Sequence, residues 1–242
     1  MRWAAPYSGT APTIERIIMT TSTPTLPGIL FVWTSADPEH ELDFNRWYDR
    51  EHVEERVRIP GFVSGTRYQS VRGPRKYLGL YRTTSLNAFQ TPDYFKAFGQ
   101  QTPWSLTNLE RMRDPMRRVC AIEAEAGAGT GAWLAVLRLG ASAIGQDGAA
   151  VARVAELGRA LLQLDGVIYA RLLTPDANLS GPLPAERKEG RVLDPLFLID
   201  ASSESAAVAA VTQASAALGL DPEEAAILQL SWQLRDTDLR AA

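Results

Sequence analysis

Cysteine is almost missing from this chain of 242 residues, in which Cys120 is the single example. One thiol excludes an internal disulfide and any metal site built from several cysteines. The default expectation is therefore a reducing compartment, and we predict a cytoplasmic protein. Cys120 itself lies in an apolar stretch, which favours an inert residue of the core.

Long hydrophobic runs and an excess of one charge are also missing. No apolar stretch approaches the length needed to span a bilayer, which argues against a membrane protein. The formal net charge is -3, and acidic and basic residues are interleaved along the chain. We therefore expect neither nucleic acid nor an anionic membrane surface as a partner. Hydrophobic residues at 45% and charged residues at 22% are typical of a globular protein.

The N-terminal stretch, residues 1–27, lacks clear periodicity and the unbroken apolar core of a signal peptide. A second methionine, Met19, offers another translation start. We expect residues 1–18 to be upstream sequence or a flexible tail, and residues 1–27 as a whole to be a leader that precedes the fold.

Residues 28–126 alternate between strand and helix patterns. An apolar run rich in branched and aromatic residues predicts a strand at 28–35, and helical spacing follows until Pro60-Gly61. The order of predicted elements is β-α-β-β-α-β, which is the ferredoxin-like plan. The elements after the first strand are a helix at 39–57, strands at 62–71 and 76–83, a helical region interrupted at Pro103, and a strand at 116–124.

Residues 131–236 repeat this order after the glycine-rich segment 127–131. The turn before the second strand is Pro60-Gly61 in one half and Asp165-Gly166 in the other. We interpret the second half as a degenerate ferredoxin-like repeat with one long connection at 175–192, which we expect to be a mobile excursion. Its predicted elements are strands at 132–140, 167–174, 195–201 and 226–234 and helices at 148–164 and 203–217.

The repeat predicts the fold class, which is α+β. One ferredoxin-like unit leaves one face of its four-stranded sheet bare, and that apolar face must be buried. Two units in one chain bury it by packing their sheets face to face as an α+β barrel with the helices outside. A duplicated chain can close such a barrel alone, so a homodimer remains an option rather than a requirement.

Functional side chains are distributed unevenly between the halves. The first half holds both histidines, His40 and His52, and most of the tryptophan and tyrosine. The second half is rich in alanine and leucine, and we expect it to act as scaffold. Helical spacing places one stripe of residues on a single side of the predicted first helix. The stripe consists of Phe44, Trp47, Tyr48, Glu51, His52 and Glu55.

This stripe and the strand after it resemble the EthD-like group of the dimeric α+β barrel superfamily. The matching residues are Phe44, Trp47-Tyr48, His52, Pro60-Gly61 and Tyr68, within roughly residues 28–125. The resemblance implies a ferredoxin-like barrel and a pocket near this helix. Members of the superfamily include lyases, isomerases, cofactor-free monooxygenases and haem-binding enzymes, so the resemblance implies the fold better than the reaction.

The candidate catalytic residues are His52, Tyr48 and Glu51. An imidazole titrates near neutrality and suits general acid–base work, with Glu51 near enough in sequence to orient it. The alternative for His52 is a helix C-terminal residue that complements the helix dipole. Packing explains the aromatic residues almost as well as ligand contact does. The expected substrate-binding residues are Trp47, Tyr68, Arg67, Tyr81 and Trp33.

We expect no metal and no cofactor. The neighbours Glu51 and His52 lack the i, i+4 spacing of a helical ligand pair. Relatives with duplicated barrels bind haem through a histidine of the second half, where this chain has none. The expected partner is a small hydrophobic or aromatic ligand, which aromatic walls with Ser, Thr and Tyr hydroxyls would suit.

The leading hypothesis is a cofactor-independent enzyme that uses His52 for proton transfer on an aromatic or polyketide-like carbonyl compound. The reaction would be an isomerisation, a dehydration or a related lyase step. One alternative is a cofactor-free monooxygenase of a phenolic substrate. Another is a non-catalytic protein that binds a hydrophobic metabolite.

Overall fold

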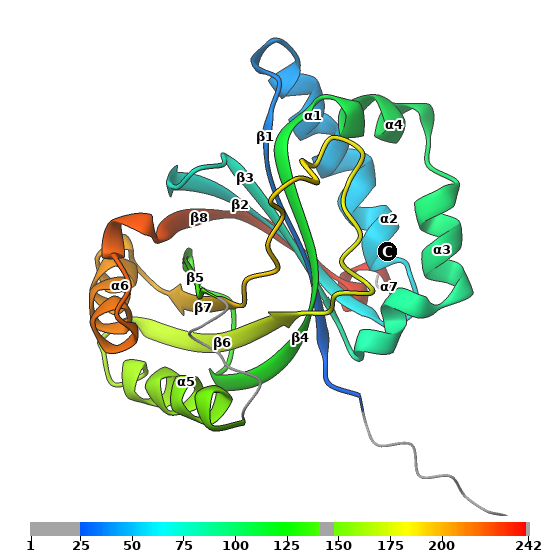
Figure 1. The fold of residues 1–242 in the computed structure, drawn as a ribbon. Coiled ribbons are helices and arrows are strands. Elements are labelled where there is room, and N and C mark those ends of the chain that lie inside the picture. Colours follow the sequence, from blue (N-terminus) through cyan, green and yellow to red (C-terminus); the bar gives the residue numbers. More distant parts are fainter. Residues whose placement is uncertain (1–24, 141–147, 241–242) are drawn as a thin grey trace, which may run out of the picture.

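The computed structural model describes residues 25–140 and 148–240, and the predicted leader therefore lies almost wholly outside the described residues. Eight antiparallel strands form a closed barrel in the order β1-β3-β2-β8-β5-β7-β6-β4. This confirms the predicted α+β barrel (Figure 1). The strands are β1 (Gly28–Ala36), β2 (Phe62–Arg72), β3 (Tyr77–Thr83), β4 (Met112–Gly127), β5 (Trp133–Arg138), β6 (Val167–Pro175), β7 (Leu196–Ala201) and β8 (Ala226–Arg235).

The helices lie outside the barrel, as predicted. Those of the first half, from α1 to α4, cover one side, and α5 and α6 cover the other (Figure 1). The α-helices are α1 (Glu41–Trp47), α2 (Val53–Val57), α3 (Pro92–Gly99), α4 (Pro103–Glu110), α5 (Gly148–Leu161), α6 (Glu204–Leu218) and α7 (Asp236–Arg240). The 3₁₀ segments are Pro38–His40, Leu86–Gln90 and Pro222–Glu224, and a π-helix spans Tyr48–His52.

The two halves use the same strand order and close on each other at both edges. The first half is ordered β4-β1-β3-β2 and the second β8-β5-β7-β6. Strand β2 pairs with β8, and the long β4 pairs with both β1 and β6. The edge strands that each four-stranded sheet would expose on its own are therefore hydrogen-bonded to strands of the other half.

Alternation along the strands separates three apolar layers. On β1, Phe31 and Trp33 point into the barrel, while Leu30 and Val32 pack outward under the helices of the first half. A separate layer lies under α5 and α6. Branched and aromatic side chains thus fill much of the barrel interior.

Proline and hydroxyl residues set the start of several helices. Thr91 and Thr102 cap α3 and α4 by accepting hydrogen bonds from Tyr94 N and Ser105 N, each with proline at the next position. Helix α6 begins after Ser203, whose side chain accepts a hydrogen bond from Ala206 N, and it ends at Gly219, whose φ of 67° suits glycine. The helical region that the sequence predicts around Pro103 is therefore two helices.

The long connection between β6 and β7 packs against the first half. Glu186, 6% exposed, forms ion pairs with Arg118 at 2.5 Å and Arg191 at 2.7 Å. Ser180 Oγ accepts from Val119 N at 2.9 Å, and Leu183 joins the apolar layer under the first-half helices. Polar anchors at several points hold this segment across β4 (Figure 1).

Candidate functional site

The first helix of the barrel contains a π-turn at its candidate catalytic residues. In this turn Val53 N–H donates to the carbonyl of Tyr48, an i→i+5 bond, between the α-helical segments α1 and α2. Turns of this kind are rare and are found frequently at functional sites. The extra residue in the turn leaves Tyr48 and His52 both buried, with ring centroids 5.1 Å apart.

His52 lies in the layer between this helix and the outer face of the sheet. Its ring centroid is 4.2 Å from that of Trp47 and 6.2 Å from that of Tyr81, and the residue is 8% exposed. The buried Nδ1 has no hydrogen-bond partner among the described residues. Burial, reinforced by the positive charges of Arg56 and Arg67, holds the pKa of His52 well below its usual range. The imidazole is therefore neutral at physiological pH.

Two tyrosine hydroxyls share this layer. Tyr48 and Tyr81 are buried, and burial raises the pKa of both, so both keep their protons. The hydroxyl of Tyr81 is buried and has the Tyr48 hydroxyl as its polar neighbour. The layer thus contains a neutral base whose buried Nδ1 lacks a partner among the described residues, close to two protonated phenols, and an unpaired buried polar atom of this kind is rare in folded proteins.

Glycines on the outer face of the sheet allow the helix to approach. A Cβ at Gly79 would lie 3.6 Å from the ring and hydroxyl of Tyr48, and one at Gly65 would lie 2.7 Å from Val53. These two glycines leave room on the outer face of the sheet. In the structure, Tyr48, Tyr81 and Val53 fill that room.

Arg67 is a buried cation of the layer, as is Arg56. Its guanidinium pairs with Asp49 at 2.8 Å, donates to Asn45 Oδ1 at 3.1 Å and lies 4.2 Å from the ring centre of Tyr48. Asp49 also accepts from Trp232 Nε1 of the second half at 2.8 Å. These contacts place a fixed positive charge beside the two tyrosines.

Glu51 does not contact His52. Its carboxylate accepts hydrogen bonds from Thr102 Oγ1 at 2.5 Å and Ser105 Oγ at 3.2 Å, at the start of α4. Ser105 also accepts from Trp47 Nε1 at 2.9 Å. Glu51 therefore joins the π-turn to α4 and fixes the indole against which His52 packs.

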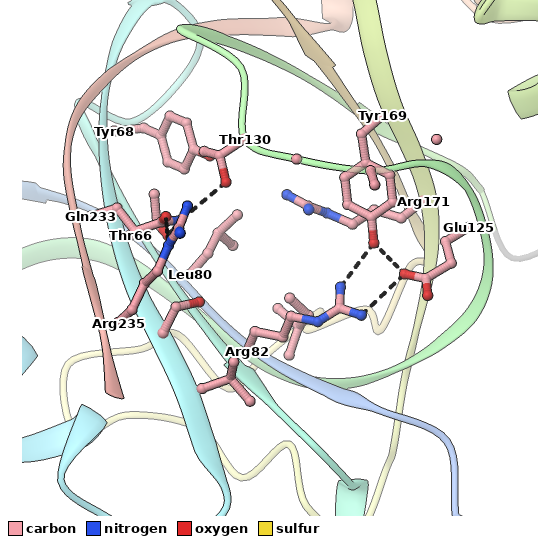
Figure 2. Close-up of a pocket in the computed structure, with 16 residues that line it drawn as sticks. Thr66, Tyr68, Leu80, Arg82, Glu125, Thr130, Tyr169, Arg171, Gln233 and Arg235 are labelled. Atoms are coloured by element: carbon pink, nitrogen blue, oxygen red, sulfur yellow. Dashed lines mark hydrogen bonds and ion pairs between the residues drawn. The ribbon is translucent and has the colours of Figure 1, made fainter. Parts of the chain in front are cut away.

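Two predicted substrate-binding residues face the barrel interior. Tyr68 lines a cavity of about 280 Å³ at one mouth of the barrel (Figure 2). Trp33 borders a larger cavity of about 740 Å³ toward the opposite end of β1 and donates to the carbonyl of Arg75 at 3.1 Å. Neither of these cavities is lined by His52. The structure thus brings His52, Tyr48, Trp47, Arg67 and Tyr81 together, and places Tyr68 and Trp33 elsewhere.

The second half, which we expect to act as scaffold, also contributes polar side chains to a cavity. Tyr169, Arg171, Gln233 and Arg235 of that half line the cavity that contains Tyr68. Sequence reasoning missed them, although Tyr169 and Arg171 alternate with apolar residues on a predicted strand. Alternation of this kind on a strand with one helix-covered face could have indicated polar groups directed into the barrel.

Residues 25–140 and 148–240 contain neither a cluster of metal ligands nor a helix that could span a membrane. No group of three or more His, Cys, Asp or Glu side chains there is arranged to hold a metal ion. No helix in this part of the chain is long and apolar enough to cross a membrane.

Comparison with models of known families gives no match, and neither does comparison with curated protein sequences. Solved structures do match. An anthrone oxidase-like protein is 12% identical with a TM-score of 0.59, covering 88% of this chain and 94% of that protein. A candidate monooxygenase from Fusobacterium nucleatum is 7% identical with a TM-score of 0.53, covering 87% and 95%.

A candidate monooxygenase from Lactobacillus acidophilus is 8% identical with a TM-score of 0.51, covering 87% of this chain and 97% of its own. At sequence identities this low, the structural similarity establishes the fold alone. The reaction has to be inferred from the geometry of the site. The chain has the α+β barrel fold of these proteins, closed from eight antiparallel strands with its helices outside.

Proposed function

We propose that this protein is an enzyme that removes a proton from a small aromatic or polyketide-like carbonyl compound, with His52 as the base. The observation that carries the proposal is the π-turn Tyr48–His52, which holds a buried imidazole with an unpartnered Nδ1 close to the neighbouring hydroxyls of Tyr48 and Tyr81. A ligand that offers one acidic proton and one oxygen acceptor would pair with the imidazole and with these hydroxyls.

The electrostatics of the layer suit an anionic intermediate. The low pKa of His52 keeps the imidazole ready to accept a proton, and the same positive charges of Arg56 and Arg67 would stabilise an enolate or phenolate. These charges also disfavour the imidazolium, so the reaction suits substrates with an acidic C–H or O–H. Tyr48 and Tyr81 retain their protons and can donate to the substrate oxygen.

The simplest reaction returns the proton to another position of the substrate, as in an isomerisation, or expels water in a dehydration. His52 would then act first as base and later as acid. Because the aromatic layer is closely packed around His52, substrate binding requires this layer to open between the helix and the sheet. Glu51, bonded to Thr102 and Ser105, would hold the α4 side of that layer in position.

Oxygenation is the second candidate, favoured by the aromatic walls around His52 and by the names of the proteins with the same fold. The same proton removal would give a carbanion that reacts with O₂. A CH₂ group becomes a carbonyl, one oxygen atom enters the product and the other leaves as water. Oxygen consumption during turnover separates this reaction from isomerisation or dehydration.

The test compares His52→Gln with His40→Ala, since the chain has only these two histidines. Turnover of anthrone-like and phenolic carbonyl compounds should fall about 100-fold or more in His52→Gln and remain unchanged in His40→Ala. The glutamine variant should keep the native circular dichroism spectrum. Full activity in folded His52→Gln would remove the assignment. Tight ligand binding without conversion in the wild type would instead support a non-catalytic binding protein.

We also infer that the two halves, residues 28–126 and 131–236, derive from one duplicated unit of the EthD-like type. The identical strand order of the halves supports this inference. Because each half covers the other, a second copy of the chain is not needed to close the barrel. A cytoplasmic location and a homodimer formed through the helices remain part of the proposal.

A further inference from the structure

The cavity at the mouth of the barrel is separate from the layer around His52. On β2, Thr66 lines this cavity and the adjacent Arg67 points to the opposite face of the sheet, into the helix layer. The cavity has a volume of about 280 Å³, close to the lower limit for small-molecule sites. It therefore has room for a compact ligand and does not share the groups of the proposed catalytic site.

Three arginines from three strands converge on this space. Arg82 of β3, Arg171 of β6 and Arg235 of β8 all line it (Figure 2). Convergence of side chains from both halves requires the closed barrel, so the arrangement is a property of the whole fold. Of the three, Arg171 is buried and Arg235 is exposed.

The positive charge is only partly balanced. Arg82 pairs with Glu125 at 3.2 Å, and Arg171 pairs with Asp200 beneath the cavity at 3.2 Å. The side chain of Arg235 donates to the neutral Gln233 at 3.1 Å, and its backbone N–H donates to Asp238 Oδ2 at 2.8 Å. The guanidinium of Arg235 itself forms no ion pair among the described residues, so it can engage an anion at the cavity.

Hydrogen-bond donors also outnumber acceptors. The Nε of Arg171 is buried without a partner in the described part of the chain. Thr66 and Thr130 each accept from Gln233 Nε2, at 2.9 and 3.1 Å, which leaves their own hydroxyl protons to donate. The one carboxylate of the lining, Glu125, is already engaged by Arg82 and the hydroxyl of Tyr169.

The remaining lining is apolar or small. Ile29 and Leu80 supply apolar surface, and residues 127–129 border the opening. A Cβ at Gly127 would lie 2.2 Å from the carbonyl oxygen of Ile168, and φ there is 78°, so glycine is required for this segment to pass so close to β6. An ion that carries only oxygens would leave the apolar surface unused.

We propose that the barrel mouth binds a small organic carboxylate. Its carboxylate contacts Arg171 and Arg235, since planar guanidinium groups match the geometry of a carboxylate, and its apolar part lies against Ile29 and Leu80. The Thr66 and Thr130 hydroxyls complete the shell of donors. This site holds a ligand without using His52.

The test is calorimetric titration of the full chain with benzoate and pyruvate as probes, and with benzamide and inorganic phosphate as comparisons. Saturable binding of at least one carboxylate is expected in the millimolar range or tighter. Benzamide should bind at least tenfold more weakly because it lacks the charge. Phosphate should not displace the bound carboxylate at equal concentration.

Arg235→Gln should weaken carboxylate binding about tenfold or more, because one charged hydrogen-bond donor is lost. Arg58→Gln, which alters an exposed pair with Glu54, is the matched control and should bind as the wild type does. If Arg235→Gln fails to fold, Thr130→Val is used and should weaken binding several-fold. Three results would each overturn the proposal: no saturable binding of either carboxylate, equal binding of benzamide, or unchanged affinity in the folded variant.

Discussion

Single residues in this protein derive their properties from distant parts of the chain. His52 is neutral because helix packing buries it beside Arg56 and because Arg67 reaches it from β2. The sequence predicted His52, Tyr48 and Trp47 as neighbours, since helical spacing is local. It could not predict the bonds of Glu51 to Thr102 and Ser105, which join residues about fifty positions apart.

The pH dependence of stability should report on His52. Its pKa in the folded protein lies well below the ordinary value of 6.5, so the unfolded chain binds a proton more readily. The free energy of unfolding should therefore fall as the pH drops below about 6.5, by at most ~1.4 kcal/mol per pH unit, and stay level above it. Urea titrations of the wild type and His52→Gln over this interval measure the effect.

Titrating carboxylates are common to the two proteins and cancel in the difference. The stability of the wild type relative to His52→Gln should thus decline toward acid pH. Parallel curves for the two proteins would show that His52 is not held neutral by the fold.

Glu186 provides a second prediction for a single residue. Its side chain is 4% exposed and carries the negative charge opposite Arg118 and Arg191. Glu186→Gln should lower the free energy of unfolding by about 3–5 kcal/mol, because two largely buried guanidinium groups lose their counter-charge. Urea denaturation followed by tryptophan fluorescence measures the loss.

Glu189→Gln is the control on the same connection, since Glu189 and its partner Arg187 are both largely exposed. It should leave the urea midpoint unchanged. If Glu186→Gln also leaves the midpoint unchanged, the buried charges do not anchor the connection between β6 and β7.

At the level of elements, periodicity predicted nearly every strand and helix, because alternation and helical spacing follow from burial on one face. The predicted helix at 39–57 is one continuous helical stretch from Pro38 to Val57. The π-turn within it had no sequence signal, since its i→i+5 hydrogen bonding depends on how both flanks pack on the sheet. Periodicity also could not show that the long connection at 175–192 is anchored to β4.

Deletion of Arg50, an exposed residue of the π-turn, tests whether this turn serves function. Removal of one residue should convert the turn to regular α-helix while α1 and α2 keep their contacts with the sheet. Helix content by circular dichroism should be preserved, and turnover should be lost because Tyr48 and His52 change their relative orientation.

The variant Arg50→Ala keeps the length of the helix and is the matched control. Its turnover should equal that of the wild type. Undiminished turnover in the folded deletion variant would show that the π-turn has no role in the reaction.

At the scale of the whole molecule, the fold was predictable because two amphipathic sheets in one chain have one efficient way to cover each other. The placement of polar groups in the barrel mouth was not. Arg82, Arg171 and Arg235 lie on strands from both halves, and only the β2–β8 and β4–β6 pairings bring them together. Their convergence therefore depends on register, which a single sequence does not reveal.

The mutual covering of the halves predicts the behaviour of a fragment. A chain that ends at residue 130 would expose the inner face of β1, with Phe31 and Trp33, to water. We expect this fragment to self-associate, with a second copy taking the place of the missing sheet. Sedimentation of the fragment and the full chain measures this, and a folded monomeric fragment would contradict it.

Closure of the barrel also limits how intact copies of the protein can associate. Each of the eight strands already has a hydrogen-bonded neighbour on both sides. In the described part of the chain, little backbone edge is left on which another polypeptide could extend the sheet, which is the route by which many β-rich proteins form fibrils. The main stretch is the start of β4, which pairs with β1 but meets β6 only from Cys120 onward. We therefore expect intact copies to associate mainly through side chains of the outer helices and loops, which surface substitutions can alter without disturbing the barrel.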